Sequence, residues 1–295
     1  MTLSGVITES STTNVVSTPK SVEDFFDFCQ KREDIRLKRA AGQPPPWTDD
    51  PIFQTYHFCN IRRQDDYGTV WYMENVLPEA KDATDLLWKT TLYRVVNNLD
   101  WFRNLNYSKW FEKSGVFGRH EWDEYHADIL NSIEAAPPPY SPAHITLQSP
   151  DGKDRKQHLF QTITWLHVKI EPFAPQVYGA DNLKSIWGAL QQIPYVGPFI
   201  ALQIYRDLIL VGALPFSDDD FVYLGPGCRL GLSMIFPELK LYRQQYLALQ
   251  EIRRINPLGL NLGDIEHSMC EAAKYWKLQG GKGRHRYYRT HLATN

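Results

Sequence analysis

Amphipathic helical segments, separated by proline and glycine breakers, follow one another along most of this sequence. Ser21, with Asp24 three residues later, has the pattern of a helix N-cap, and Gly42 ends that first segment. Asp50 and Pro51 form a second start signal, since proline fits the first helical position. Predicted helices cover residues 21–41, 50–62, 82–98, 106–113, 120–134, 158–169, 180–191, 199–211, 227–234, 239–256 and 262–278. Only short β-like runs remain, so the predicted fold class is mainly α.

Segments of unusual composition indicate how the chain is divided. Residues 1–20 are rich in Ser and Thr and lack periodicity, which predicts a disordered N-terminal arm. Residues 135–154 hold five prolines and a turn signal, which predicts a loop between two lobes. These lobes are expected at about 21–135 and 155–278, followed by a basic tail at 279–295.

Charge, hydropathy and cysteine spacing exclude several classes of protein. The 32 Lys and Arg nearly balance the 34 Asp and Glu, so a nucleic-acid-binding surface must be a local patch. No run of about 18 apolar residues is present and no secretory signal opens the chain, which predicts a cytoplasmic protein with no membrane partner. The four cysteines lack C-x-x-C spacing and the histidines lack H-x-x-x-H spacing, so no metal site is predicted.

Residues 190–202 have the pattern of a helix–hairpin–helix motif, in which a helix ends, a tight turn follows and an apolar helix begins. The backbone amides of such a turn face a DNA phosphate, so Tyr195, Val196 and Gly197 are candidate DNA-binding residues. A monovalent cation is the one ion expected at this hairpin. Tyr195 occupies a position where the motif often has glycine. The alternative is an ordinary hairpin of two helices with Gly197 as a cap.

Three consecutive aspartates, at 218–220, follow the hairpin by about twenty residues. Helix–hairpin–helix DNA glycosylases place their catalytic aspartate at this distance, and counting back from Arg229 favours Asp220. Phe199 stands where the members that also cleave the sugar–phosphate have a nucleophilic lysine, which argues against Schiff-base chemistry. The alternative for the aspartates is a solvated turn that caps a helix.

A second glycine turn, formed by Gly225, Pro226 and Gly227, imitates a dinucleotide-binding fingerprint. Its spacing is G-x-G-x-x-x-G and it lacks a βαβ setting, so a nicotinamide or flavin site is rejected. Gly225, Gly227 and the nearby Arg229 are candidate DNA-binding residues, because glycine lets the backbone approach a phosphate or a flipped base. A plain turn that leads into a helix is the alternative.

Several blocks of the chain match one family of DNA-modifying proteins. The matching blocks are residues 28–37, 45–52, 56–63, 65–66, 195–201 with Asp207, 220–222, 225–227 and 264–275. The chain resembles the amino acid:DNA transferases, or α-glutamyl/putrescinyl-thymine pyrophosphorylases, which are related to the helical domain of bacteriophage 5-hydroxymethyluracil DNA kinases. The resemblance implies a two-lobed helix–hairpin–helix DNA glycosylase-like fold for a catalytic domain at 21–278. It also implies action in the host cytoplasm during phage infection.

The family's reaction starts from double-stranded DNA that carries 5-pyrophosphoryloxymethyl-uracil, made by a separate kinase. Pyrophosphate leaves, and a free amino acid or polyamine adds to the exocyclic carbon. No cofactor besides this amine co-substrate is implied. The reaction needs a flipped base, cations for the leaving group, a general base and exclusion of water. The sequence contains no P-loop, so this chain is not expected to be the nucleotide-dependent kinase.

Candidate residues for each requirement are present. Those predicted to bind pyrophosphate and substrate are Arg36, Arg39, Arg62, Arg63, Trp47 and Tyr56, because guanidinium groups bind phosphate bidentately and rings stack on bases. Asp220 is the candidate general base, and Asp207 the candidate that holds the substrate ammonium. The alternatives are surface ion pairs for Arg36, Arg39 and Asp207, and core packing for the aromatic rings.

Two other functions fit part of this pattern. In a monofunctional glycosylase, Asp220 would stabilise an oxocarbenium ion while a modified base is excised. In a non-catalytic DNA-binding module, Asp220 would be dispensable. The block at 45–52, with Arg62 and Arg63, favours the transferase.

The basic tail predicts a contact with the DNA backbone. Lys282, Arg284 and Arg286 lie among tyrosines and no acidic residue follows them. Deletion of residues 282–295 should weaken DNA binding equally for all sequences and reduce its dependence on salt. Binding titrations over a salt series measure both effects, and unchanged binding by the truncated protein would contradict the prediction.

Overall fold

A computed structural model of the protein describes residues 19–97 and 155–281, with a few isolated helical positions between them. Over these residues the chain is helical and contains no strand, which confirms the predicted mainly α class. The β-like run at 221–224 is extended but pairs with no other strand among them. Several expectations lie wholly or largely outside the described residues: the arm at 1–20, the helices at 106–113 and 120–134, the loop at 135–154, and Lys282, Arg284 and Arg286 of the tail.

The helices begin close to their sequence signals. They are α1 (Val22–Ala40), α2 (Pro51–Thr55), α3 (Tyr67–Asn75), α4 (Ala83–Val96), α8 (Arg155–Tyr178), α9 (Leu183–Leu190), α10 (Pro198–Leu210), α11 (Pro226–Ile235), α12 (Tyr242–Arg254) and α13 (Leu262–Gln279), with 3₁₀ helices η1 (Arg63–Asp65) and η2 (Leu77–Glu79). Ser21 and Asp24 form a reciprocal capping box at the start of α1. Asp50 and Asp82 accept backbone N–H bonds at the starts of α2 and α4.

Three helices differ from the prediction. α2 ends at Thr55 rather than near residue 62, because the following chain is extended and Arg32 bonds its carbonyls. α8 continues past the predicted end at 169 and through Pro172 and Pro175, since its residues beyond 169 still pack into the core. α3 was not predicted, and no side-chain cap marks its start.

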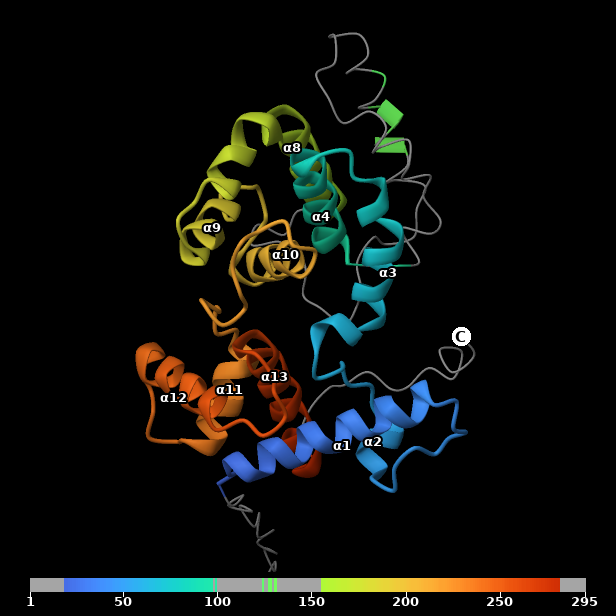
Figure 1. Cartoon of the computed structure of the whole chain (residues 1–295), viewed down its shortest axis with the longest axis vertical. Helices are drawn as coiled ribbons and strands as arrows, with labels where there is room; N and C mark the ends of the chain where they lie inside the picture. Colours follow the sequence, from blue (N-terminus) through green and yellow to red (C-terminus); the bar gives the residue numbers. More distant parts are fainter. Residues whose placement is uncertain are drawn as a thin grey trace, which may run out of the picture.

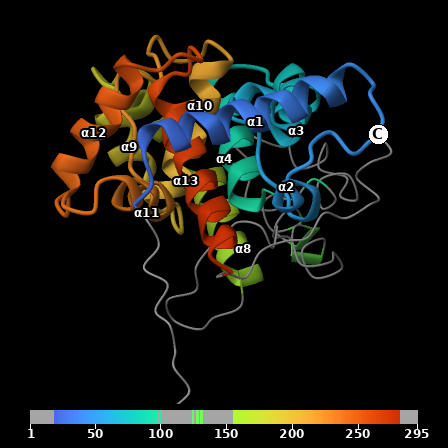
Figure 2. The same ribbon diagram turned by 90° about the horizontal axis from the view of Figure 1, so that it is seen from below.

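The helices gather into two groups, which Figure 1 shows one above the other. One group contains α1, α2, α11, α12 and α13, and the other contains α3, α4, α8, α9 and α10. Each group contains helices from both halves of the sequence. The grouping therefore does not follow the expected lobes of 21–135 and 155–278. The reason is that the apolar face of α1 is covered by α13, across which α1 runs in Figure 2.

An aromatic cluster connects the N-terminal helices to α13 within the first group. Its ring centroids lie 4.9–6.0 Å apart, and the rings belong to Phe28 of α1, Phe53 of α2, Phe58 and Tyr275 of α13. Burial of several large rings stabilises this contact strongly. The cluster therefore attaches the N-terminal helices to α13.

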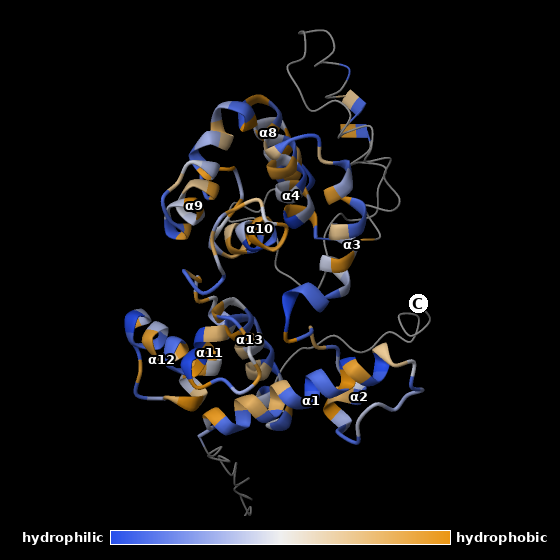
Figure 3. Ribbon diagram, viewed as in Figure 1, coloured by the Kyte–Doolittle hydropathy of each residue, from blue (hydrophilic) through white to orange (hydrophobic). Residues whose placement is uncertain are grey.

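Helix α10 lies at the centre of the second group. Residues 200–208 are all buried, and Figure 3 shows mainly hydrophobic residues along this helix. Three of the buried residues are polar: Gln203, Arg206 and Asp207. Among the described helices, none combines the length and apolar content that a bilayer span requires.

Two glycines let α11 approach α13 closely. A Cβ atom on Gly231 would lie 2.7 Å from the backbone oxygen of Met269, and one on Gly227 would lie 2.1 Å from Sγ of Cys270. Both distances are shorter than van der Waals contact, so a larger residue forces the helices apart.

Gly231→Ala should lower the free energy of unfolding by about 1–3 kcal/mol, because the obstructing atom belongs to the backbone of α13. Gly188→Ala in α9 is the matched control, since no atom lies within 4 Å of a Cβ there. Alanine favours helix, so the control should raise stability by up to about 1 kcal/mol. Urea unfolding measures both changes, and equal changes would contradict the packing argument.

Candidate functional site

A buried carboxylate between two arginines lies where the two helix groups meet. Asp207 of α10 is fully buried and accepts bonds from Nε and Nη2 of Arg63, at 3.0 and 2.9 Å. It also accepts from Nε of Arg94 and, at 2.9 Å, from its Nη2. Burial disfavours the carboxylate, but the two arginines outweigh it and lower the pKa of Asp207 below its ordinary value.

A second buried arginine extends this network. Arg206 is 2% exposed, and its Nη2 lies 2.8 Å from Asp218 and 2.9 Å from Asp264 of α13. Burial opposes its charge, while the two carboxylates raise its pKa above the ordinary value. Asp264 also accepts a bond from the backbone N–H of Arg63, at 3.2 Å. We call Arg63, Arg94, Arg206, Asp207, Asp218 and Asp264 the junction network.

The junction network includes two of the predicted substrate-binding residues. Asp207 was expected to hold a substrate ammonium and Arg63 to bind pyrophosphate, but both are buried. Each is already bonded to buried partners, Arg63 also to Gln203. Neither side chain reaches a ligand without breaking bonds of the junction network.

The other predicted arginines lie nearer the surface. Arg36 and Arg62 both donate to Glu33, at 2.7 and 2.9 Å, and each side chain is 27% exposed. The hydrogen bond from Arg36 lowers the pKa of Glu33 despite its partial burial. Arg36 also lies 3.3 Å from Asp65. The ion pair with Glu33 that was the alternative for Arg36 is thus present, and it leaves both guanidinium groups partly accessible.

Arg39 and two aromatic candidates lie at the same end of α1 and in the segment that follows. The guanidinium of Arg39 is exposed and lies over the half-buried Trp47 ring, 5.0 Å from its centroid. Trp47 also donates from Nε1 to the carbonyl of Gln43, at 2.6 Å. Tyr56, at the C-cap of α2, is half-buried.

The predicted hairpin is a tight turn between α9 and α10. Tyr195 has φ of +62°, a left-handed conformation that favours glycine, and this is the position where the helix–hairpin–helix motif often has glycine. Its ring stacks on His158 of α8 at 3.9 Å, and its hydroxyl donates to Gln161 at 2.5 Å. Gly197 is the N-cap of α10, and no atom lies within 4 Å of a Cβ there. Packing within the protein therefore does not require glycine at 197.

The three aspartates after α10 have different environments. Asp218 belongs to the junction network, and Asp219 pairs with Arg253 at 2.9 Å and accepts from the N–H of Leu262 at 2.7 Å. Asp220 is exposed and accepts one bond, from the N–H of Ser217 at 2.7 Å. Within 19–97 and 155–281, no cation pairs with Asp220. It is therefore the aspartate best placed to receive a ligand.

The second glycine turn faces the protein interior. Gly225 is buried and donates its N–H to Oε1 of Glu266, at 2.9 Å, while Gly227 faces Cys270. Burial raises the pKa of Glu266 to about 7, and the bond from Gly225 opposes this rise. Gly227 allows α11 to pack closely on α13, since a Cβ atom there would lie 2.1 Å from Sγ of Cys270. Arg229 is exposed, donates to Gln245 at 2.9 Å and lies 5.7 Å from the Tyr242 ring.

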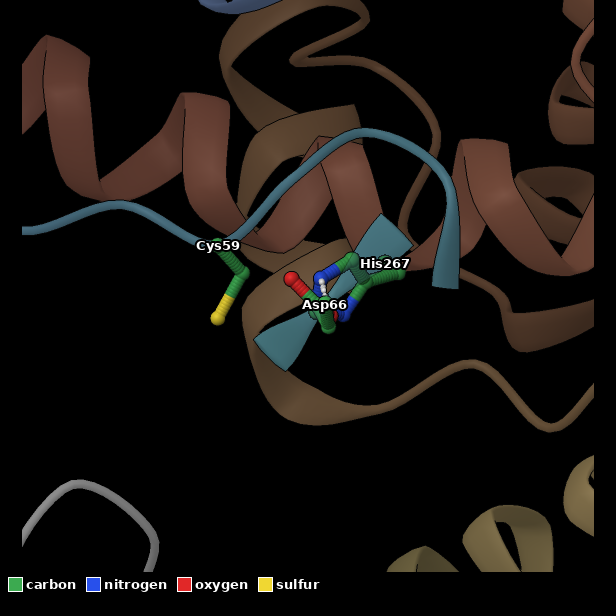
Figure 4. A group of neighbouring side chains, drawn as sticks. All are labelled: Cys59, Asp66 and His267. Carbon is green, nitrogen blue, oxygen red and sulfur yellow. Dashed lines mark ion pairs between the residues drawn. The ribbon is translucent and has the colours of Figure 1, made fainter. Parts of the chain in front are cut away.

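Cys59, Asp66 and His267 lie close together, as Figure 4 shows. This cluster was not predicted from the sequence. One potential metal-binding atom from each lies within 4.8 Å of the others, and Nε2 of His267 is 3.8 Å from Oδ2 of Asp66. Burial, with Glu271 and Asp66 nearby, raises the pKa of Cys59 well above its ordinary value. Burial also raises the pKa of Asp66 to about 6. No motif pointed to this cluster, because its residues come from opposite ends of the chain.

Comparison with known proteins relates the chain to one family. The family described as 5-hmdU DNA kinase, helical domain, matches residues 19–284. A protein named 5-hmdU DNA kinase, from Bacillus phage SP10, is 25% identical over 288 residues. The alignment covers 85% of this chain but 44% of that kinase, so the chain spans less than half of its relative. No solved structure matches the chain.

Asp207→Ala should lower the free energy of unfolding by about 3–5 kcal/mol, because Arg63 and Arg94 would remain buried without their counter-charge. Asp27→Ala is the control, since Asp27 pairs with Lys31 on the surface of α1 and its loss should cost less than about 1 kcal/mol. Denaturant unfolding of the two variants measures the difference. A small loss for Asp207→Ala would show that the junction network contributes little.

Proposed function

Because this chain belongs to the 5-hmdU DNA kinase helical-domain family, we propose that it modifies thymine bases in phage DNA. In the specific reaction that we propose, the protein displaces pyrophosphate from 5-pyrophosphoryloxymethyl-uracil in double-stranded DNA. It then joins an amino acid or a polyamine to the same carbon. The observation that carries the proposal is the family match, which extends over nearly all of the chain. A separate kinase would supply the phosphorylated base.

The proposed leaving group, pyrophosphate, is negatively charged, so the site needs cationic side chains to bind it. The bond between the exocyclic carbon and the pyrophosphate oxygen breaks with its electron pair on oxygen, so negative charge builds up on the leaving group. Arg36, Arg39 and Arg62 are proposed to bind it, since their guanidinium groups are at least partly exposed. Arg63 would act indirectly, by holding the segment that contains Arg62.

The incoming amine needs a base. A protonated amine has no free electron pair, so its proton must move to a carboxylate before the carbon–nitrogen bond forms. Asp220 is proposed as this base: Ser217 holds its Oδ2 atom, and Oδ1 remains available for the ammonium. The neighbouring Asp218 is bonded to Arg206, so the junction network would fix the turn that presents Asp220.

The hairpin and Arg229 are proposed to contact the DNA backbone. Gly197 opens α10, and helix N-termini attract phosphate groups. Neither packing nor a positive φ requires glycine at 197. A close approach of the DNA backbone would explain why this position has no side chain. Phe199, in the first turn of α10, is 36% exposed and would stack on a base.

The direct test uses DNA that contains 5-pyrophosphoryloxymethyl-uracil. The full-length protein is incubated with this DNA and a mixture of amino acids and polyamines, and the digested nucleosides are analysed by mass spectrometry. A nucleoside that has gained one amine would support the proposal and identify the co-substrate. Release of a free base would instead indicate a glycosylase, and DNA left unchanged by every amine would contradict catalysis.

Asp220→Asn should lower turnover by about 10²- to 10⁴-fold, because an amide does not accept the ammonium proton. DNA binding should persist, since the carboxylate is not a backbone contact. The same mass-spectrometric assay measures turnover, and Asp27→Asn on the surface of α1 is the control. Unchanged turnover in Asp220→Asn would exclude Asp220 as the base.

A further inference from the structure

The cluster of Cys59, Asp66 and His267 combines sulfur, oxygen and nitrogen donors in one place. Cys59 and Asp66 stand at the two ends of the segment 59–66, and His267 lies in the first half of α13. In Figure 4 the segment bends over α13, and the carboxylate of Asp66 lies beside the imidazole of His267. All three donor atoms are within 4.8 Å of one another.

Hydrogen bonds hold the segment that carries two of these donors. Nε of the buried Arg32 donates to the carbonyl of Cys59 at 3.0 Å, and its Nη2 donates to Oδ1 of Asn60 at 2.5 Å. The N–H of Asn60 donates to Oδ1 of Asp66 at 2.8 Å, and its side-chain amide donates to the carbonyl of Asp65 at 2.6 Å. The bond to Oδ1 therefore orients the carboxylate of Asp66, and its other oxygen, Oδ2, faces His267.

The surroundings of the cluster resemble the outer shell of a metal site. Glu271, one helical turn after His267, accepts from the N–H of Cys59 at 2.9 Å and from Lys274 at 2.7 Å. Its charge is thus already paired with Lys274. Such outer partners fix the orientation of ligands and raise metal affinity.

We propose that Cys59, Asp66 and His267 bind a zinc ion. A thiolate and a carboxylate together balance the two positive charges of Zn²⁺, and imidazole is a common third ligand. Magnesium and calcium prefer all-oxygen sites, so the thiol argues against them. Zinc–ligand bonds of about 2.0–2.3 Å place tetrahedral donor atoms about 3.5 Å apart. The distances between the donor atoms, now up to 4.8 Å, must therefore shorten by about 1 Å when zinc binds. Three protein ligands leave a fourth position for water or substrate, which is the arrangement of catalytic zinc sites.

The test measures binding of Zn²⁺ alone to the full-length protein after treatment with a chelator. Calorimetric titration should show one equivalent bound, and Co²⁺ should give thiolate-to-metal charge-transfer absorption. Cys59→Ser and His267→Gln should each weaken zinc binding by more than about 100-fold, since even outer-shell changes cost about 10- to 100-fold. Cys270→Ser and His57→Gln are matched controls, because Cys270 faces Gly227 and His57 is exposed; both should bind zinc normally.

Circular dichroism shows whether each variant is folded. Absence of stoichiometric zinc binding in the folded wild-type protein would overturn the proposal. So would unchanged affinity in folded Cys59→Ser and His267→Gln, or a charge-transfer band that persists in Cys59→Ser. The measurement uses neither DNA nor amine, so its result is independent of the proposed amine transfer.

Discussion

The structure depends on a buried alternation of positive and negative charges where the two helix groups meet. Asp207 lies between two arginines, and Arg206 lies between two aspartates. Removing each ion from water costs several kcal/mol, and only full pairing offsets that cost. Helices α4, α10 and α13 must therefore dock in one register, because a shift of any of them leaves a buried charge unpaired.

This constraint also organises the surface that we assign to function. Arg206 bonds Asp218, so the adjoining Asp220 is presented to solvent from a turn that is attached to the junction network. Arg63 joins η1 to α10, and η1 lies within the segment that carries Cys59 and Asp66. The proposed base and the proposed zinc ligands thus share one internal support, although they lie in different parts of the chain.

Local signals predicted local structure well. Ser21 and Asp50 cap helices where expected, because a cap is a bond between residues two or three positions apart. Helix ends were less predictable: α8 passes through Pro172 and Pro175 because core packing outweighs the missing N–H groups. Burial of charged residues was not predictable either: Arg63 and Asp207 have side chains typical of a binding site, but both lie in the core.

The sequence by itself determined the mainly α class, most helix starts and the tight turn at Tyr195, because these depend on contacts within a few residues. Only the tertiary structure decided which helices form each group and that Cys59 and Asp66 meet His267. It also decided which of the three adjacent aspartates pairs with no arginine among the described residues. The partners of Arg63 lie 144 and 201 residues away along the chain. Spacing rules do not extend to such separations, since only the packing of the whole core brings these residues together.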